Sequence, residues 1–326
     1  MHRRFIILIG VCLSGTVLSF IETTGEANAS EYTTRTVKLD DNNYERDRVG
    51  RLEWRGGFEI TSTDNRFGGL SGLHIDPKGE RITAVSDRGY WFHAGLRYKN
   101  EQLSGLSDPQ MSIMKDQRGN PVKGVTADAE SIATNDGESM LVSFERRHRV
   151  WAYKASATPP KQISTPKRLR KLRNNGGIEA MTYTCENRLL LVAEKNKTRD
   201  MHVHGWLQNG QSWDKFTYKT VAGYRPTGAT TLPDCRIMFL ERSFGFIAGV
   251  AIRVTIVNPD KLHSGAEITA QEIARFEFPI IVDNFEGIAA RKSKSGETLV
   301  YILSDDNYNP LQRTLLLMFA FTAPQG

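Results

Sequence analysis

The chain repeats one short unit five times. In each copy a small or acidic turn leads into an apolar strand, and a second strand about fifteen residues later ends in an acidic residue. The equivalent first positions of the copies, 48 to 59 residues apart, are Ser71, Glu130, Glu179, Thr227 and Glu286. A period near fifty with several short strands in each unit is typical of a β-propeller blade and not of a helical solenoid. The repeat therefore predicts an all-β chain folded as a single β-propeller.

Chain length sets the expected number of blades. Removal of residues 1–29 leaves 297 residues, which at the observed spacing suits six blades, with seven as the alternative. Residues 315–321 read as a strand of the fifth unit, and the amino-terminal strands, which include residues 51–60, would add a sixth blade. A blade built from both chain ends would close the ring. Such closure removes the exposed sheet edges of an open propeller. No helical period of useful length interrupts the strands.

The first 29 residues have the pattern of an export signal. A basic start precedes an apolar run over residues 5–20, and residues 27–29 (Ala-Asn-Ala) give a small-x-small cleavage pattern. An uncleaved membrane anchor is the alternative, although the run is short for a bilayer span. We expect a periplasmic or secreted protein with no stable membrane span after cleavage of this signal peptide. A polar leader at residues 30–50 then precedes the propeller domain, residues 51–326.

The balance of charges limits the expected partners. The formal net charge is +6, and it stays at +6 without the leader. The densest basic cluster, Lys167 to Arg173, lies between a proline-containing stretch and an Asn-Gly stretch, so we expect it in a loop. A solvated loop and contact with an anionic ligand or surface both fit this cluster. We expect a monomer that binds a small anionic or ester substrate and no nucleic acid.

Two cysteines remain after the leader, Cys185 and Cys235. Each lies in the expected first hairpin turn of its unit, and the two units are consecutive. A disulfide between blades is consistent with an oxidising compartment, and two unpaired thiols are the alternative. The spacing leaves this choice open.

Three of the five first positions carry a carboxylate, namely Glu130, Glu179 and Glu286. Because equivalent positions of propeller blades converge on the central channel, we expect these side chains to face one axis. Carboxylates held together raise each other's pKa unless a cation compensates them. Ca²⁺ is the natural partner, and no set of cysteines and histidines with zinc spacing competes with it. Asp305 opens the densest stretch of oxygen ligands, residues 305–309, and is expected to join the site.

Basic residues follow four of the second acids, and these are Arg88, Arg146, Lys195 and Arg242. The acid–base pairs could join neighbouring blades through ion pairs, or the basic side chains could bind anionic substrate groups. No nucleophile elbow, Walker loop or dinucleotide-binding glycine motif occurs in the chain. The repeated acids and bases are therefore the candidate site.

Several motifs, in order, resemble one known family. They are residues 67–73 (Phe-Gly-Gly-Leu-Ser-Gly-Leu), 86–89 (Ser-Asp-Arg-Gly), 128–132 (Asp-Ala-Glu-Ser-Ile) and 284–289 (Asn-Phe-Glu-Gly-Ile-Ala). Over residues 50–321 the chain resembles the phytase-like family, also called "esterase-like activity of phytase". The resemblance implies an exported bacterial β-propeller and a hydrolase of phosphate or carboxylic esters. Two positions depart from the family pattern: Ala180 stands where glycine is common, and Thr227 stands in place of an acid.

The leading hypothesis is a metal-dependent hydrolase of phosphoesters or other esters. In it, Ca²⁺ is held by Glu130, Glu179, Glu286 and Asp305, and the last three are also catalytic. Anionic substrate groups are bound by Arg88, Arg146, Lys195 and Arg242. One alternative is a non-catalytic binding module of the cell envelope, and another is a lactonase-like hydrolase of sugar acids. Enzymatic activity itself therefore stays open.

Overall fold

The structure is a computed structural model. It describes residues 31–322 except 136, 138, 155–157, 198–201, 222 and 246–248, and it describes 196 and 197 by their backbone only. The expected signal peptide, residues 1–29, lies outside the described residues. The described chain consists of strands and three short 3₁₀ helices, η1 (Gly124–Thr126), η2 (Lys167–Lys171) and η3 (Pro259–Lys261). None of its helices is long and apolar enough to cross a bilayer.

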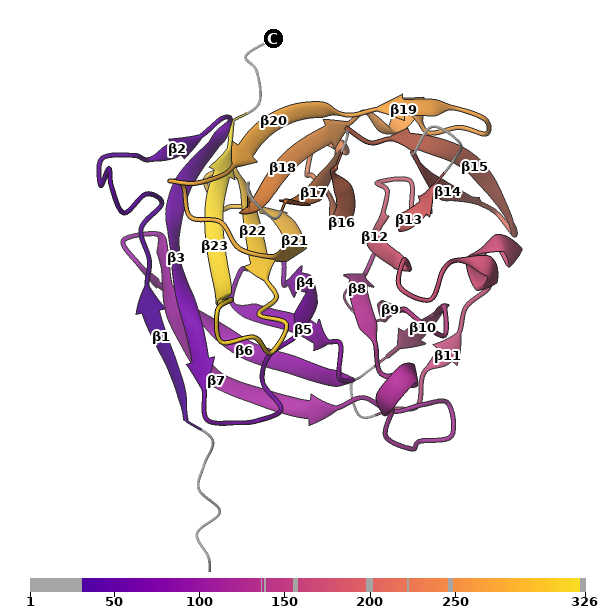
Figure 1. Cartoon of the computed structure of the whole chain (residues 1–326), viewed down its shortest axis with the longest axis horizontal. Coiled ribbons are helices and arrows are strands. Elements are labelled where there is room, and N and C mark those ends of the chain that lie inside the picture. The colour runs from indigo at the N-terminus through magenta and orange to yellow at the C-terminus, as the bar shows by residue number, and fades with distance from the viewer. Residues whose placement is uncertain are drawn as a thin grey trace, which may run out of the picture. The chain divides into compact units, whose positions relative to one another are not determined.

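Five strands, one from each sequence repeat, lie around a common axis (Figure 1). These inner strands are β4 (Leu70–Ile75), β8 (Ala129–Ala133), β12 (Ile178–Tyr183), β16 (Arg225–Thr231) and β21 (Phe285–Lys292). Each inner strand contacts the next one, and β21 contacts β4. The described chain is therefore all-β and propeller-like, as the repeat predicts.

Each inner strand begins a sheet that extends outwards from the axis. The first sheet continues through β5 (Arg81–Ser86), β6 (Tyr90–Lys99) and β7 (Gln102–Ile113), and the second through β9 (Met140–Phe144), β10 (Arg149–Tyr153) and β11 (Lys161–Gln162). The third continues through β13 (Leu189–Lys197), β14 (Val203–Asn209), β15 (Ser212–Lys219) and β19 (Glu267–Thr269), and the fourth through β17 (Ile237–Gly245), β18 (Gly249–Val257) and β20 (Gln271–Phe276). The fifth continues through β22 (Thr298–Ser304), β23 (Thr314–Phe321) and β3 (Leu52–Ser62). Strand β3 also pairs in parallel with β7, through Gly56 and Leu103, and this pairing joins the first and fifth sheets into one continuous sheet.

Both ends of the described chain meet in the fifth sheet. Strand β3 pairs antiparallel with β23, with Phe58 opposite Leu316. The length of the chain predicts six blades, but its described residues have five inner strands, because β3 joins the fifth sheet and has no inner strand of its own. Much of the remaining length lies in long strands such as the 12-residue β7. The expected polar leader also contributes strands, since β1 (Tyr32–Thr36) and β2 (Arg48–Val49) both pair with β3.

The core lies between neighbouring sheets. Strand β23 is buried along its whole length, from Thr314 to Phe321. Side chains on both of its faces pack against other sheets, which explains its continuous apolar run in place of the alternation of a half-exposed strand. Phe58 and Leu316 lie in one core cluster, and Leu315 and Phe319 lie in the next.

A disulfide joins the third and fourth sheets. Cys185 and Cys235 lie in the turns β12–β13 and β16–β17, their Cα atoms are 5.5 Å apart, and their sulfur atoms are bonded. Of the two alternatives that the spacing left open, the structure has the disulfide.

Candidate functional site

The repeated first position lies in a β-bulge of the inner strand. In β12, Ile178 pairs with Ala193 and Ala180 pairs with Val192, so that Glu179 has no partner in the ladder. The same register shift occurs at Glu130, Thr227 and Glu286, and in β4 it falls just after Ser71. Because a bulge redirects the extra side chain and interrupts pairing, the other four positions are equivalent in backbone geometry as well as in spacing. In β4, Ser71 pairs with Val85 and the bulge residue is Gly72.

The residue after each of these positions is small. These residues are Gly72, Ser131, Ala180, Gly228 and Gly287. A Cβ atom on Gly228 would lie 2.8 Å from the Glu286 carbonyl oxygen, and one on Gly287 would lie 2.8 Å from Leu73 Cβ. Neighbouring inner strands therefore approach too closely for larger side chains, and this close approach brings the acids of successive strands together.

A repeated hydrogen bond holds most of the second acids at the same end of the strands. The backbone N–H groups of Asp87, Glu145, Glu194 and Asp305 donate to the carbonyl oxygens of Gly69, Asp128, Gly177 and Asn284, at 2.8–3.0 Å. Each of these carbonyls belongs to the residue two positions before the repeated first position of the same unit, namely Ser71, Glu130, Glu179 or Glu286. The first and second acids therefore gather at one mouth of the channel.

Glu241, the second acid of the fourth unit, is held differently. Its carboxylate accepts hydrogen bonds from Tyr218 Oη at 2.7 Å, Thr255 Oγ1 at 3.0 Å and Arg253 Nη1 at 2.8 Å. The side chain is buried with these partners inside its own sheet and its neighbour. The fourth unit therefore contributes no acid to the channel mouth, since its first position is Thr227.

Two groups of carboxylates at this mouth have ligand atoms close enough to share a metal ion. One group is Asp128, Glu130 and Glu145, and the other is Glu145, Glu179 and Glu194, with the ligand atoms of each group within 4.8 Å of one another. Glu145 belongs to both groups because Gly177 N–H of the next unit donates to its Oε1 at 3.0 Å. All donors in both groups are carboxylate oxygens, which suit a hard cation.

Glu286 and Asp305, which the sequence pattern adds to the metal ligands, belong to neither group. Arg242 Nη1 donates to Glu286 Oε1 at 2.5 Å, and Ser71 Oγ donates to Glu286 Oε2 at 3.0 Å. Asp305 Oδ1 accepts from Asn307 N–H at 2.7 Å. In the structure, Glu286 is therefore neutralised by the Arg242 guanidinium, and Asp305 stabilises the loop that contains Asn307.

Burial and mutual repulsion raise the pKa of the gathered acids. Glu179 is 8% exposed, and its Oε2 has no hydrogen-bond partner among the described residues. Burial first, and then Glu194, Glu130 and Glu286, raise the pKa of Glu179 well above its ordinary value, while Arg242 lowers it. Burial, followed by Glu286 and Asp128, does the same to the pKa of Glu130. A buried carboxylate without a partner favours a bound proton or a bound cation.

Two further acids have a pKa near neutrality. Burial, with smaller contributions from Asp128 and Glu194, raises the pKa of Glu145 to about 7 against the opposing Gly177 N–H and Lys195. Burial, with Asp128 next, raises the pKa of Asp87 to about 6. Asp87 Oδ1 also lacks a hydrogen-bond partner among the described residues. Both groups can therefore exchange protons close to neutral pH.

The four basic residues expected to bind substrate all lie at this mouth, and three of them already pair with acids. Arg146 Nε lies 2.6 Å from Asp128 Oδ2, and Lys195 Nζ lies 2.6 Å from Glu194 Oε2. Arg242 pairs with Glu286. The guanidinium carbon of Arg88 lies 3.2 Å from the centroid of the Tyr308 ring. Each of the four basic side chains is thus oriented by a neighbouring side chain. A basic residue that joins two blades in this way can also bind an anionic substrate group.

Two cavities flank the acids. One of about 430 Å³ is lined by Asp87, Arg88, Lys123, Asp128 and Arg146 among others. Another of about 450 Å³ is lined by Glu194, Arg225, Arg242, Asn284 and Asn307 among others. Each is large enough for a small ligand and places basic side chains beside carboxylates.

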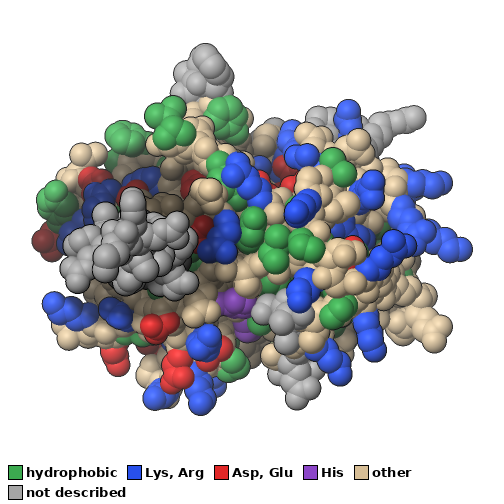
Figure 2. All heavy atoms as spheres, turned by 90° about the horizontal axis from the view of Figure 1, so that it is seen from below, with side chains coloured by type: hydrophobic (Ala, Val, Ile, Leu, Met, Phe, Trp, Pro, Cys, Tyr) green, Lys and Arg blue, Asp and Glu red, His purple; other side chains and the backbone are tan. Residues whose placement is uncertain are grey.

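The basic cluster Lys167–Arg173 lies away from these cavities. Most of it forms η2, where Leu169 is buried in the core and the four basic side chains are exposed. Figure 2 shows Lys and Arg side chains gathered on the side of the molecule where Figure 1 places β10, β11 and β15. This surface takes no part in the channel mouth.

A family model matches residues 65–308, and its description is "Esterase-like activity of phytase". The chain belongs to the phytase-like family. The match includes every first position from Ser71 to Glu286 and ends just beyond Asp305. No curated protein matches this phytase-like chain significantly.

Solved structures resemble the phytase-like chain at low sequence identity. An α-L-arabinofuranosidase from Podospora anserina has 10% identity over 84% of this chain and 98% of its own, with a TM-score of 0.49. An endo-1,4-β-xylanase from Bacteroides thetaiotaomicron has 8% identity over 81% and 94%, with a TM-score of 0.48. A putative gluconolactonase has 10% identity over 89% and 94%, with a TM-score of 0.44. These values carry no information on function.

Three acids of the phytase-like site were not among the expected ligands: Asp128, Glu145 and Glu194. A signal for Glu145 and Glu194 exists in the sequence, because the second and third units alone have Glu at both the first and the second position. The sequence pattern of Glu145 and Glu194 fits blade-joining residues as well as metal ligands. Only the contact with Gly177 of the next unit shows that Glu145 lies between the two carboxylate groups.

Proposed function

We propose that the chain is a divalent-cation-dependent hydrolase of esters, with phosphoesters as the preferred substrates. The observation that carries the proposal is the unpartnered Oε2 of buried Glu179, within a group of three carboxylates. Basic side chains line the cavities on both sides of these acids. An anionic substrate and a cation would each find opposite charge there.

The cation would be held by the two carboxylate groups that share Glu145. Their all-oxygen donor set fits Ca²⁺, the ion we propose, better than a structural zinc ion, which favours cysteine and histidine. A bound ion of this kind polarises an ester or phosphoryl oxygen and lowers the pKa of a bound water.

The chain's own side chains would position the substrate and move protons. Arg88 and Arg146 line the same cavity, where their guanidinium groups can donate paired hydrogen bonds to a phosphate. Asp87 lines that cavity as well, and its pKa of about 6 suits the transfer of a proton to or from the reacting oxygen. Arg242 would keep Glu286 neutralised and hold the adjoining wall.

The test is a hydrolysis assay on purified protein after chelation, with p-nitrophenyl phosphate and p-nitrophenyl acetate as substrates. We expect Ca²⁺ to restore activity in the wild type and to fail in Glu179→Gln. The matched control is Glu267→Gln, because Glu267 lies on the outer strand β19 with its side chain 64% exposed. Hydrolysis that persists without divalent cations in the wild type would refute the proposal. Ca²⁺ binding without hydrolysis would instead support the non-catalytic envelope module.

We also propose that the protein acts in the periplasm or outside the cell. The Cys185–Cys235 disulfide supports this location, since disulfides persist in oxidising compartments. Fractionation of cells that express the full chain would test it, with amino-terminal sequencing of the exported form. We expect cleavage after residue 29, and recovery of uncleaved protein in the cytoplasm would contradict the proposal.

A further inference from the structure

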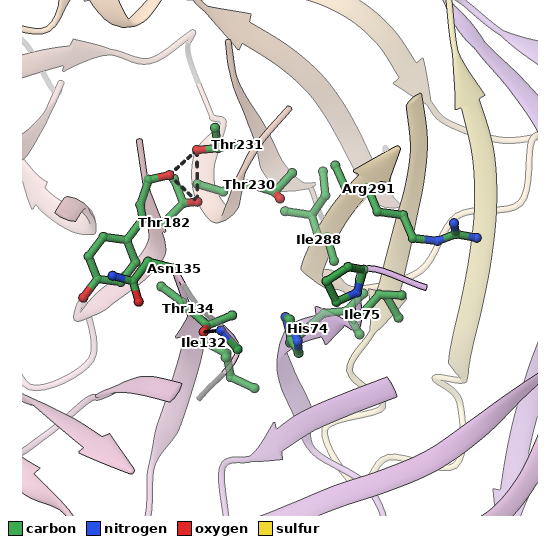
Figure 3. Close-up of a pocket in the computed structure, with 18 of the residues that line it drawn as sticks. His74, Ile75, Ile132, Thr134, Asn135, Thr182, Thr230, Thr231, Ile288 and Arg291 are labelled. Atoms are coloured by element: carbon green, nitrogen blue, oxygen red, sulfur yellow. Dashed lines mark hydrogen bonds between the residues drawn. The ribbon is translucent and has the colours of Figure 1, made fainter. Parts of the chain in front are cut away.

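The other mouth of the channel contains a separate cavity of about 500 Å³ (Figure 3). All five inner strands line it, through residues such as His74 of β4, Ile132 of β8, Thr182 of β12, Thr230 of β16 and Ile288 of β21. Each of these residues follows the bulge position of its strand by two or three residues. Along each inner strand, the small residue that contacts the neighbouring strand lies between the repeated first position and the residue that lines the cavity. The cavity is therefore distinct from the acids at the opposite mouth.

The lining of this cavity has little charge. It includes no acidic residue among the described residues, and its basic members are Arg291 and Lys292. The Arg291 guanidinium donates two hydrogen bonds to Tyr301 Oη, at 3.0 and 2.9 Å, and Figure 3 shows it directed away from the opening. Lys292 is exposed at the end of β21. Among the described residues, a cation inside the cavity would therefore find no carboxylate, and an anion would find only Arg291, which is held by Tyr301, and the exposed Lys292.

Apart from the two basic side chains, the polar side chains of the lining carry hydroxyls, the amide of Asn135 and an imidazole. Thr231 Oγ1 donates to the Tyr183 carbonyl oxygen at 2.5 Å and lies 3.3 Å from Thr182 Oγ1. By contrast, no side-chain hydrogen bond joins His74 or Thr230 to another described residue, although both line the cavity. Figure 3 shows these two side chains around the same central space. Their hydrogen-bonding capacity is available to a ligand.

His74 is neutral near pH 7, because burial lowers its pKa and Asp76 opposes this only in part. A neutral imidazole offers one donor and one acceptor. The branched apolar side chains of Ile75, Ile132 and Ile288 form part of the wall, beside the threonines. A sugar ring combines apolar C–H faces with hydroxyl groups that both donate and accept, and this matches such a wall.

We propose that this cavity is a second ligand site, which binds an uncharged molecule with several hydroxyl groups and the size of a mono- or disaccharide. The volume lies within the range of small-molecule sites. This site does not depend on the hydrolytic site, since its ligand would contact neither the carboxylate groups nor their cation.

The test uses the full chain labelled with ¹³C-histidine and follows the ring Cε1–H signals during titration. The probes are glucose and maltose as neutral sugars and inorganic phosphate as the anion. The His74 signal is assigned by its loss in His74→Gln. We expect a saturable shift of this signal with at least one of the two sugars and none with phosphate. Thr230→Val, which keeps the shape and removes the hydroxyl, should raise the Kd about 2- to 12-fold, the factor for one neutral hydrogen bond.

Two controls separate this site from general effects. Thr269→Val makes the same change at an exposed position of β19 and should leave the Kd unchanged. Glu179→Gln should also leave the sugar-induced shift unchanged, whatever it does to hydrolysis. Absence of a saturable shift with both sugars would overturn the proposal. A His74 shift with phosphate alone would overturn the assignment of an uncharged ligand.

Discussion

Arg242 of β17 places Nη1 2.5 Å from Glu286 Oε1 on the neighbouring inner strand β21. The fourth unit has no acid at its first position, and it contributes this cation to the channel mouth instead. One of the three repeated glutamates is thereby compensated by the protein itself. In the second and third units Asp128 and Glu194 also have protein cations, Arg146 and Lys195. Glu130, Glu145 and Glu179 have no ion pair among the described residues and remain for an external cation, so the charge around the axis is asymmetric.

Removal of Arg242 should therefore destabilise the protein. Glu286 is partly buried, with its side chain 12% exposed, and Arg242→Met would leave it without its cation. We expect a loss of about 3 kcal/mol in the free energy of unfolding, as for other broken buried pairs. Urea unfolding at neutral pH measures the loss. Arg35→Gln breaks a pair with Glu59 in which the Arg35 side chain is 76% exposed, and this change should cost less than about 1 kcal/mol. Equal losses in the two variants would contradict the asymmetry.

The pH dependence of stability should reveal the raised pKa of Glu145. Its folded-state pKa of about 7 lies above the ordinary 4.5, so its protonated form is favoured by folding. This stabilisation is complete below the ordinary value and is lost as pH rises through about 7. Without divalent cations, the stability of the wild type relative to Glu145→Gln should therefore fall across this window.

The comparison with Glu145→Gln is needed because histidines have the opposite slope. Burial lowers the pKa of His204 to about 4, and its stabilising effect grows with pH up to the ordinary 6.5. Urea unfolding of both proteins across the window gives the difference directly, and Ca²⁺ should reduce its fall. A difference that rises with pH in the metal-free protein would show that Glu145 is not held as described.

Asp87 should matter for hydrolysis and not for cation binding. It lines the cavity beside Arg88 and belongs to neither carboxylate group. We expect Asp87→Asn to lower the kcat of ester hydrolysis about 10²- to 10⁴-fold, the usual effect of losing a proton-transfer group. Asp260→Asn, at an exposed position, is the matched control. A normal kcat in Asp87→Asn would exclude Asp87 from proton transfer.

The disulfide should stabilise the third and fourth sheets relative to the unfolded chain. Cys185 and Cys235 are separated by 50 residues, and closing a loop of this length contributes about 4 kcal/mol. A reductant should therefore lower the Tm of the wild type. It should have no effect on a protein in which both cysteines are replaced by alanine. A wild-type Tm that does not respond to reductant would show that the thiols are unpaired in solution.

The propeller-like class follows from the sequence because each unit contains its own inner strand and turn. The number of sheets does not follow, because unit length varies with strand length. Strands β6 and β7 have 10 and 12 residues, whereas β9 and β10 have five each. The sequence pattern of the amino-terminal strand β3 also resembles the start of a unit. In the structure, however, β3 pairs with β23, more than 250 residues later in the chain.

The equivalence of Glu130, Glu179 and Glu286 could be predicted, since all three occupy the same bulge of an inner strand. The sequence could not predict which acids lie close enough to bind one metal ion together, because this depends on contacts between units. The Gly177 N–H that holds Glu145 and the Arg242 guanidinium that holds Glu286 both come from a neighbouring unit. Neither contact can therefore be predicted from the sequence of a single unit.

The most direct test of a cation among the carboxylates is a thermal melt of the chelated protein, with Ca²⁺, Mg²⁺ or Zn²⁺ then added back. An ion that binds only the folded state raises the free energy of unfolding by about 2.7 kcal/mol at a hundredfold excess over its Kd. We predict a rise in Tm with Ca²⁺ that is larger than with the other ions and is lost in Glu179→Gln but kept in Glu267→Gln. An unchanged Tm with every ion, or an equal rise in Glu179→Gln, would contradict the proposed cation site.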